Sequence, residues 1–310
     1  MGVLNKAVQF EHIMIPAEKQ FLQRNKLPDS YLESANRWFA PLVAEFSEAL
    51  TLKSPLIIGI NGTQGSGKST LADYLCTMLG EHKLTTVSLS LDDFYLTRAE
   101  RQTLADTVHP LLKTRGVPGT HDIALALNTI NSLIEGLGET LIPRFDKSTD
   151  DRHLEADCDL VSGAVDVIIF EGWCVGAKPQ PEAALAQAVN SFEQEKDANS
   201  SWRNFVNNTL ASDYQPLFDR IDKLIMLRAP SFDTVFNWRL EQEQKMIARL
   251  AEQNEADTSG VMSEAQIAEF IAHYQRITEF SLEEMPGRAD YLFQLDSHRQ
   301  IISYAKLGCA

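Results

Sequence analysis

Eight consecutive residues, Gly62-Thr63-Gln64-Gly65-Ser66-Gly67-Lys68-Ser69, could bind the phosphate groups of a nucleotide. They satisfy the pattern G-x-x-x-x-G-K-[ST], with a short apolar run before them and a helix-forming stretch after them. The glycines let the turn point its backbone N–H groups inward around a phosphate. Lys68 would reach the β- and γ-phosphates, and the Ser69 hydroxyl would bind Mg²⁺. The predicted nucleotide-binding residues are Gly62, Thr63, Gln64, Gly65, Ser66, Gly67, Lys68, Ser69 and Thr70.

Two neighbouring carboxylates, Asp92 and Asp93, follow an apolar run at residues 85–91. Acidic side chains at the end of a buried strand are costly unless they are solvated or used. The next helix has a capping box of its own, Thr97 with Glu100, so it does not need these aspartates as caps. Either carboxylate could take the proton of an attacking hydroxyl, or could bind Mg²⁺ through water. The sequence alone does not choose between the two aspartates.

Glu171 ends a second apolar run, residues 165–170, and is followed by a glycine. P-loop proteins hold Mg²⁺ with an acid at this kind of strand end, next to the phosphate loop. The alternative is an acid that belongs only to a turn. The predicted metal ligands are Ser69 and Glu171, and the predicted cofactors are ATP and Mg²⁺.

Clustered basic residues are informative because the chain has a formal net charge of −15. One loop, residues 113–122, contains Arg115 and His121, which could hold an anionic substrate, and Asp122, which could equally start a helix. A second loop, residues 143–152, mixes both signs of charge, so a solvated loop is its alternative. Arg239 lies near the edge of a helix face and could close over the phosphates, since a guanidinium grips two oxygens at once.

Composition narrows the class of protein further. The negative charge argues against nucleic acid or an anionic membrane as a partner, because both are polyanions. The four cysteines are scattered and form no C-x-x-C pair, which predicts reduced thiols rather than a zinc site or disulfides. No signal peptide and no apolar stretch of about 18 residues is present, so we expect a cytoplasmic protein.

Strand-like and helix-like segments alternate from residue 56 onward, which predicts an α/β protein with a parallel sheet between helices. The expected strands are residues 56–60, 85–91, 165–170, 223–227 and 291–295. Active sites of such sheets lie beyond the carboxyl ends of the strands. We expect one domain over residues 1–310, with a helical extension at 1–50 packed on its outside and inserts near 144–158 and 187–214.

With these residues identified, the chain resembles the D-glycerate 3-kinase family of P-loop kinases, which is related to pantothenate kinase, uridine kinase and phosphoribulokinase. The resemblance rests on ordered segments at residues 59–70, 90–97, 115–122, 143–148 and 170–173. The sequences R-G-x-P-G-T-H-D and P-R-F-D-K-S indicate the glycerate-like branch. The short acidic stretch after the second of these departs from the longer Gly- and Arg-containing loop of members with established glycerate activity.

The resemblance implies a three-layer P-loop fold with lid insertions, and transfer of the ATP γ-phosphate to a hydroxyl of a small metabolite. It favours Asp92 as the catalytic base, with Asp93 as its neighbour or a substrate ligand. The predicted catalytic residues are Lys68, Asp92, Asp93 and Arg239. The predicted substrate-binding residues are Tyr95, Arg115, His121, Asp122, Arg144 and Lys147.

The leading acceptor is D-glycerate. A kinase of the same mechanism that acts on pantothenate, a nucleoside or another polyol is the first alternative. An ATPase without a small acceptor is the second, and the lack of an N-K-x-D motif after the phosphate loop and of an L-S-G-G-Q motif argues against it.

Overall fold

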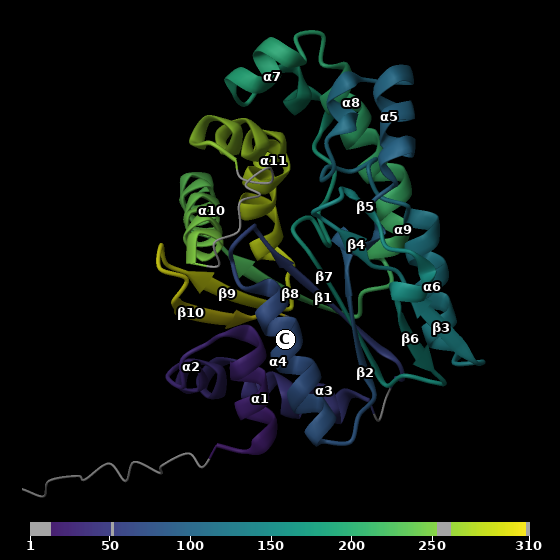
Figure 1. Ribbon diagram of the computed structural model, residues 1–310, viewed down its shortest axis with the longest axis vertical. Coiled ribbons are helices and arrows are strands. Elements are labelled where there is room, and N and C mark those ends of the chain that lie inside the picture. Colours follow the sequence, from purple (N-terminus) through teal and green to yellow (C-terminus); the bar gives the residue numbers. More distant parts are fainter. Residues whose placement is uncertain (1–13, 51–52, 253–261, 308–310) are drawn as a thin grey trace, which may run out of the picture.

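The computed structural model describes residues 14–50, 53–252 and 262–307. A six-stranded sheet in the order β10-β9-β8-β1-β7-β2 forms its centre (Figure 1). Its strands are β1 (Leu56–Gly62), β2 (Thr86–Ser90), β7 (Val167–Gly172), β8 (Lys223–Arg228), β9 (Tyr291–Leu295) and β10 (Ile301–Lys306). All neighbours pair in parallel except β9 and β10, which are antiparallel.

The five parallel strands confirm the strands expected from the apolar runs, to within two residues at each end. Strand β10 is not among the strands expected from the sequence. This strand lies at the edge of the sheet and its side chains are mostly exposed, so no apolar run in the sequence indicates it.

Helices cover both faces of the sheet, which confirms the three-layer α/β architecture (Figure 1). The helices are α1 (Pro16–Asn25), α2 (Tyr31–Trp38), α3 (Ala40–Ala49), α4 (Lys68–Glu81), α5 (Arg98–Thr107), α6 (Ile123–Glu135), α7 (Ser191–Lys196), α8 (Ser201–Thr209), α9 (Gln215–Phe218), α10 (Phe232–Glu252) and α11 (Glu264–Glu284). One core joins α1, α2, α3 and α4 to the sheet, and the core on the opposite face contains α6, α8, α9 and α11. Alternate side chains of β1 enter the two cores, Ile57 on one face and Ile58 on the other.

The stretch before β1 differs from the single helix that its fourfold apolar spacing suggests. Its helical pattern is divided at Phe39, which ends α2 and precedes α3. Pro41 lies in the first turn of α3, where its missing N–H costs nothing, whereas inside a continuous helix its ring would clash with the preceding turn. Leu42 and Phe46 are buried against the sheet as the spacing predicts.

Residues 139–162, which include the insert expected near 144–158, contain two short antiparallel pairs. Strand β3 (Glu139–Ile142) pairs with β6 (Asp159–Ser162), and β4 (Phe145–Asp146) pairs with β5 (Asp151–Arg152). The pairing of β4 with β5 brings Arg152 back toward the end of β2, since its Nε donates to the carbonyl of Tyr95 at 2.8 Å.

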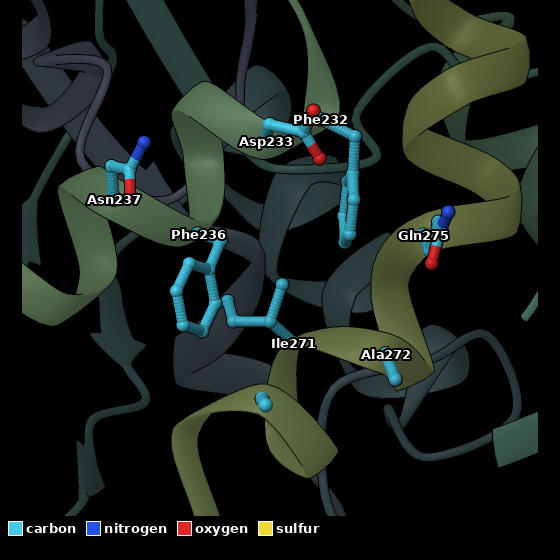
Figure 2. Close-up of a pocket in the computed structure, with 8 residues that line it drawn as sticks. Phe232, Asp233, Phe236, Asn237, Ile271, Ala272 and Gln275 are labelled. Carbon is cyan, nitrogen blue, oxygen red and sulfur yellow. The ribbon is translucent and has the colours of Figure 1, made fainter. Parts of the chain in front are cut away.

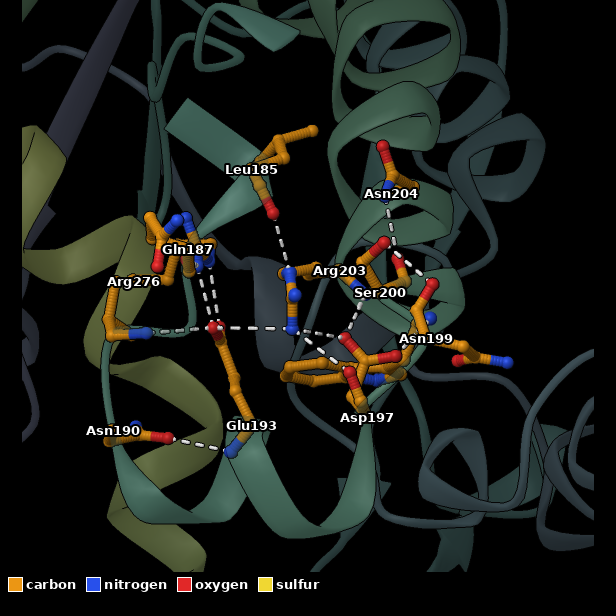
Figure 3. A network of polar contacts seen from close by, with 12 residues as sticks. Leu185, Gln187, Asn190, Glu193, Asp197, Asn199, Ser200, Arg203, Asn204 and Arg276 are labelled. Carbon is orange, nitrogen blue, oxygen red and sulfur yellow. Dashed lines mark hydrogen bonds and ion pairs between the residues drawn. The ribbon is translucent and has the colours of Figure 1, made fainter. Parts of the chain in front are cut away.

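A buried ionic network holds the segment around residues 187–214 (Figure 3). Glu193, which is 1% exposed, accepts hydrogen bonds from Arg276 of α11 at 2.6 and 2.7 Å. Arg203 of α8 pairs with Asp197 at 3.1 Å and lies 3.9 Å from Glu193. This polar segment is therefore tied to α11 by charges that compensate one another inside the protein.

None of the helices in the described part of the chain has the length and apolar character needed to cross a membrane.

Candidate active site

The phosphate loop joins β1 to α4 at the carboxyl end of the central strand (Figure 1). Gly65 and Gly67 have φ values of +78° and +91°, a conformation that glycine adopts without steric cost. Gly62 has no room for a side chain, because a Cβ there would overlap Ser66 Oγ. The first N–H groups of α4 have no intrahelical partner and lie at the positive end of the helix dipole. The loop and the helix together can therefore bind an anion.

Three side chains of this loop end in buried polar atoms that lack a hydrogen-bond partner among the described residues. These atoms are Thr63 Oγ1, Gln64 Oε1 and Ser66 Oγ. Buried polar atoms are normally paired, so their presence here marks a place where a ligand or water completes the hydrogen bonding.

Ser69, Lys68 and Glu171 lie together beside the loop. Ser69 Oγ donates to Glu171 Oε1 at 2.8 Å, and Lys68 Nζ lies 3.8 Å from Glu171 Oε2. Glu171 is 6% exposed, and its Oε2 has no hydrogen-bond partner among the described residues. A hydroxyl and a carboxylate side by side are the oxygen ligands that Mg²⁺ takes together with phosphate oxygens. The residues present thus fit the predicted metal.

Asp92 lies on the short 3-10 helix η1 (Leu91–Phe94), directly after β2. Its Oδ2 accepts a hydrogen bond from Lys147 Nζ at 2.6 Å, and its Oδ1 accepts one from Tyr95 Oη at 2.9 Å. Burial opposes ionisation of this carboxyl, but the charges of Lys147 and Lys68 and the two hydrogen bonds outweigh it. The pKa of Asp92 therefore lies below its usual range, and the group is a carboxylate at neutral pH.

Asp93 has different partners. Its Oδ2 accepts a hydrogen bond from Arg144 Nη1 at 2.7 Å, and Arg144 also pairs with Asp159 at 2.6 Å. Burial raises the pKa of Asp93 above its ordinary value, although the charge of Arg144 acts against the increase. The two adjacent aspartates thus have opposite pKa shifts.

A cleft of about 810 Å³ lies beyond the ends of the central strands and connects many of these groups. The predicted site residues that line it are Gln64, Gly65, Lys68, Ser69, Asp92, Tyr95, Arg115, Lys147 and Arg239. Asp93 and Arg144 are not among its lining residues. Because Lys68 and Asp92 border the same space, a terminal phosphate and an acceptor hydroxyl could meet there.

Arg101, which is not among the predicted site residues, lines the cleft from α5 although it is 1% exposed. Its guanidinium donates to the carbonyls of Leu96, Lys113 and Asp150 at 3.1, 2.9 and 2.7 Å. The Asp150 carboxylate pairs with Arg101 at 2.9 Å and also with Arg115. Arg115 therefore shares one carboxylate with a buried arginine.

Arg239 reaches the cleft from α10, where it pairs with Glu243 at 2.7 Å. Glu243 is 1% exposed and also accepts a hydrogen bond from the N–H of Met262 at 2.6 Å. Arg239 is thus held at the edge of the cleft by a carboxylate that also contacts the chain just before α11.

A separate cavity of about 370 Å³ lies between α10 and α11. Figure 2 shows Phe236 of α10 beside Ile271 of α11, with Phe232 and Gln275 further along the same space. No predicted site residue lines this cavity, so the chemistry belongs to the cleft.

His121, predicted to bind the substrate, is not among the residues that line the cleft. Its ring stacks on Tyr95 with centroids 4.5 Å apart, and its Nδ1 lies 2.6 Å from Tyr214 Oη. Burial lowers the pKa of His121 to about 3, so the imidazole is neutral. The ring thus contacts Tyr95, which lines the cleft, and Tyr214.

Asp122 also lies outside the lining of the cleft. Its Oδ1 accepts a hydrogen bond from the N–H of Leu125 at 2.9 Å, so it caps α6, and its Oδ2 lies 3.0 Å from Arg152 Nη2. Helix initiation, the alternative weighed for this residue, is the role that its contacts support.

Three aromatic side chains that line the cleft were not predicted as site residues: Trp173, Phe270 and Tyr274. Phe270 and Tyr274 lie four residues apart on α11, a spacing typical of the buried face of a helix. Tyr274 Oη donates to the carbonyl of Arg115 at 3.2 Å, and Trp173 Nε1 donates to the carbonyl of Gly116 at 2.9 Å. These hydrogen bonds hold the loop that carries Arg115 and Gly116, and no local sequence signal indicates them.

Comparison with known proteins agrees with this geometry. The chain is 39% identical over 229 residues to the uncharacterized kinase mug58 of Schizosaccharomyces pombe, which covers 71% of this chain and 78% of that protein. It is 31% identical over 230 residues to the chloroplastic D-glycerate 3-kinase of Arabidopsis thaliana, and this alignment covers 71% of the chain and 46% of that longer protein. A solved D-glycerate 3-kinase from Cryptococcus neoformans superposes with a TM-score of 0.70 at 26% identity, over 86% of this chain and 98% of that one. No protein-family model matches.

Proposed function

Since the chain belongs to the D-glycerate 3-kinase family of P-loop kinases, and is thus an ATP-dependent phosphotransferase with an alcohol group as acceptor, we propose that its acceptor is a small hydroxy acid, D-glycerate. The γ-phosphoryl group of Mg-ATP would pass to one of its hydroxyl groups.

The observation that carries this proposal is local positive charge in an acidic protein. The formal net charge is −15, yet the cleft that Asp92 lines is also lined by basic side chains away from the phosphate loop, among them Arg101, Lys113, Arg115 and Lys147. Binding a carboxylate or a phosphate is the ordinary use of arginines gathered in one place. An acceptor that carries a carboxylate beside its hydroxyl could place the carboxylate against these basic side chains and the hydroxyl against Asp92.

In the proposed reaction the acceptor oxygen forms a bond to the γ-phosphorus while the bond from that phosphorus to the β–γ bridging oxygen breaks, and its electron pair leaves with ADP. Asp92 orients the acceptor hydroxyl and receives its proton. Lys68 and Arg239 compensate the charge on the phosphoryl oxygens. Since the pKa of Asp92 is low, positioning contributes more than basicity.

Ser69 and Glu171 would hold Mg²⁺ against the phosphates. Mg²⁺ supplies neutralisation of the β- and γ-phosphate oxygens when it is bound. Substitution of Glu171 by Gln should therefore raise the Mg²⁺ concentration needed for half-maximal activity, while the affinity for free ATP changes less.

A larger acceptor such as pantothenate or a nucleoside is the second candidate. The aromatic side chains Trp173, Phe270 and Tyr274 favour it, because they give the cleft an apolar wall that a three-carbon acid does not need.

An ADP-release assay with Mg-ATP and a panel of acceptors tests the proposal: D-glycerate, L-glycerate, pantothenate and uridine. Stimulation by D-glycerate well above the other acceptors is the expected result. Stimulation by pantothenate or uridine alone would favour the second candidate, and ATP hydrolysis that no acceptor stimulates would contradict both.

The location of the protein stays a prediction. We propose a cytoplasmic enzyme on the grounds of its sequence, although the plant relative is named as chloroplastic.

A further inference from the structure

The turn between β4 and β5 places two oppositely charged side chains in the cleft, Lys147 and Asp150. Lys147 Nζ donates to Asp92 Oδ2 at 2.6 Å. The Asp150 carboxylate pairs with Arg115 and, at 2.9 Å, with Arg101. One short segment therefore contacts both the carboxylate that would face the acceptor hydroxyl and the arginines that could hold an acceptor carboxylate.

Among the residues that the structure describes, Asp150 is the only carboxylate paired with either of these arginines. Its Oδ1 contacts Arg115 Nη1 and its Oδ2 contacts Arg101 Nη2, so each oxygen serves a different guanidinium. A ligand carboxylate has the same charge and the same two oxygens, and it could take the same place. With Lys147 at Asp92, the turn thus offers the two kinds of group that a hydroxy acid carries, a hydrogen-bond donor and a carboxylate.

The arginines do not depend on the Asp150 carboxylate for their positions. The Arg101 guanidinium donates to three backbone carbonyl groups at distances between 2.7 and 3.1 Å. Both guanidiniums also lie over the ring of Phe145, at 5.9 Å from its centre for Arg101 and 5.4 Å for Arg115. The two cations should therefore stay in place when the carboxylate moves away.

Asp150 is the partner that can leave. Its side chain is 36% exposed and that of Arg101 is 1% exposed, so the Asp150 carboxylate can turn into solvent while the arginine cannot. Rotation between side-chain rotamers is enough for this movement. The turn itself keeps its position, because the backbone carbonyl of Asp150 still accepts the hydrogen bond from Arg101 at 2.7 Å.

We propose that Asp150 occupies the place of the acceptor carboxylate in the free enzyme, so that the acceptor binds by exchanging its own carboxylate for that of Asp150. This inference rests on the proposed function and makes Asp150 a specificity-determining residue that does not contact the reacting atoms. An acceptor that also reaches Asp92 with its hydroxyl gains enough to displace Asp150. An anion without that hydroxyl gains less, so Asp150 keeps simple anions out of the cleft.

Asp150→Asn tests the exchange, because it removes the charge and keeps the shape of the side chain. Asparagine also tolerates the positive φ of 58° at this position. The KM for D-glycerate in ADP release should fall by about three- to tenfold, since a partly exposed ion pair no longer has to be broken. The Kd for ATP should stay the same.

Asp151→Asn is the matched control, because it makes the same change of charge at the next residue. The Asp151 carboxylate accepts from the backbone N–H groups of Arg98 and Arg152, at 3.3 and 2.9 Å, and does not line the cleft. Both constants should be unchanged in this variant.

A lower KM distinguishes the proposed role from a purely structural one, because a variant that only loosened the turn would bind the acceptor less tightly. An unchanged or higher KM for D-glycerate in Asp150→Asn would overturn the inference and leave the proposed function intact. Absence of ADP release with D-glycerate in the wild type would instead contradict the proposed function.

Calorimetric binding of glycolate, a small hydroxy carboxylate, tests the exchange without turnover and whatever the natural acceptor is. Asp150→Asn should bind glycolate about three- to tenfold more tightly than the wild type does, and Asp151→Asn should match the wild type. Equal affinities in the wild type and Asp150→Asn, or binding to neither, would overturn the inference.

Discussion

The two halves of the cleft are built in different ways. The donor half, residues 62–70 with Glu171, comes from one continuous loop and the end of the neighbouring strand. The acceptor half takes its cations from α5 and from two separate loops. In the donor half, Lys68 and Glu171 are 3.8 Å apart, whereas in the acceptor half Lys147 lies 2.6 Å from Asp92 and Arg115 pairs with Asp150.

An acidic protein can keep a basic pocket when carboxylates inside the pocket compensate its cations. The acceptor cations are largely compensated by internal carboxylates, and an incoming anion must compete with Asp150 for Arg115. The donor half instead presents backbone N–H groups and a helix dipole, which need no counter-ion. Variants of the donor half should therefore affect turnover most, and variants of the acceptor half should affect acceptor affinity.

The largest effect is expected for Lys68→Met. Removal of the charge that faces the phosphoryl oxygens should lower kcat by roughly 10³-fold, comparable to the loss of other transition-state cations. Steady-state ADP release at saturating acceptor measures this loss, and Lys83→Met, at an exposed lysine two residues after α4, is the control. A decrease in kcat of less than tenfold would contradict the expectation that variants of the donor half affect turnover most.

The acceptor half depends on α11, which the buried network of Figure 3 holds in place. Glu193→Gln should leave Arg276 and Arg203 without their shared carboxylate and destabilise the protein by about 3–5 kcal/mol. Denaturant unfolding measures this, with the exposed Glu195→Gln as the matched control. A loss below about 1 kcal/mol would mean that the network contributes little to anchoring α11.

Arg115→Ala tests whether this arginine of the acceptor half binds the acceptor and not ATP. The KM for the acceptor should rise by about 10- to 100-fold, since a hydrogen bond to a charged group contributes about 1.5–3 kcal/mol, while the Kd for ATP should not change. The exposed Arg98→Ala is the control. Equal acceptor KM values in the variant and the wild type would remove Arg115 from the acceptor site.

The smallest effect concerns His121, whose pKa falls from the usual 6.5 to about 3 on folding. The unfolded state then binds the proton more readily, so stability should decrease as the pH falls from about 6.5 toward 3. His121→Gln should reduce this slope by up to about 1.4 kcal/mol per pH unit, measured by denaturant unfolding between pH 6 and pH 4. The exposed His82→Gln should keep the wild-type slope.

The donor half could be predicted from sequence because its chemistry is consecutive in the chain. The spacing of Gly62, Lys68 and Ser69 defines the loop, and the rule that sites follow strand ends finds Glu171. The parallel strands could be predicted for a similar reason, since each is a buried apolar run.

The acceptor half could be predicted only in part. Arg101 is recognisable as a site residue only when its three carbonyl partners, from distant loops, are known. Asp92 and Asp93 are consecutive residues of the same type, and the sequence does not show that they have different cation partners, Lys147 and Arg144. The sequence favoured His121 as an anion ligand because it does not show that this ring is buried and in contact with Tyr214, which are properties of the tertiary structure.

The role of Asp92 as the residue that orients the acceptor hydroxyl is tested most directly by comparing Asp92→Asn with Asp93→Asn. Acceptor-stimulated ADP release and the Kd for ATP are measured for both variants. Asp92→Asn should lower kcat by about 10²- to 10⁴-fold with ATP binding retained, and Asp93→Asn should have a much smaller effect. Retained turnover in Asp92→Asn, or a larger loss in Asp93→Asn, would contradict the placement of the transferred phosphate and the acceptor hydroxyl at Asp92.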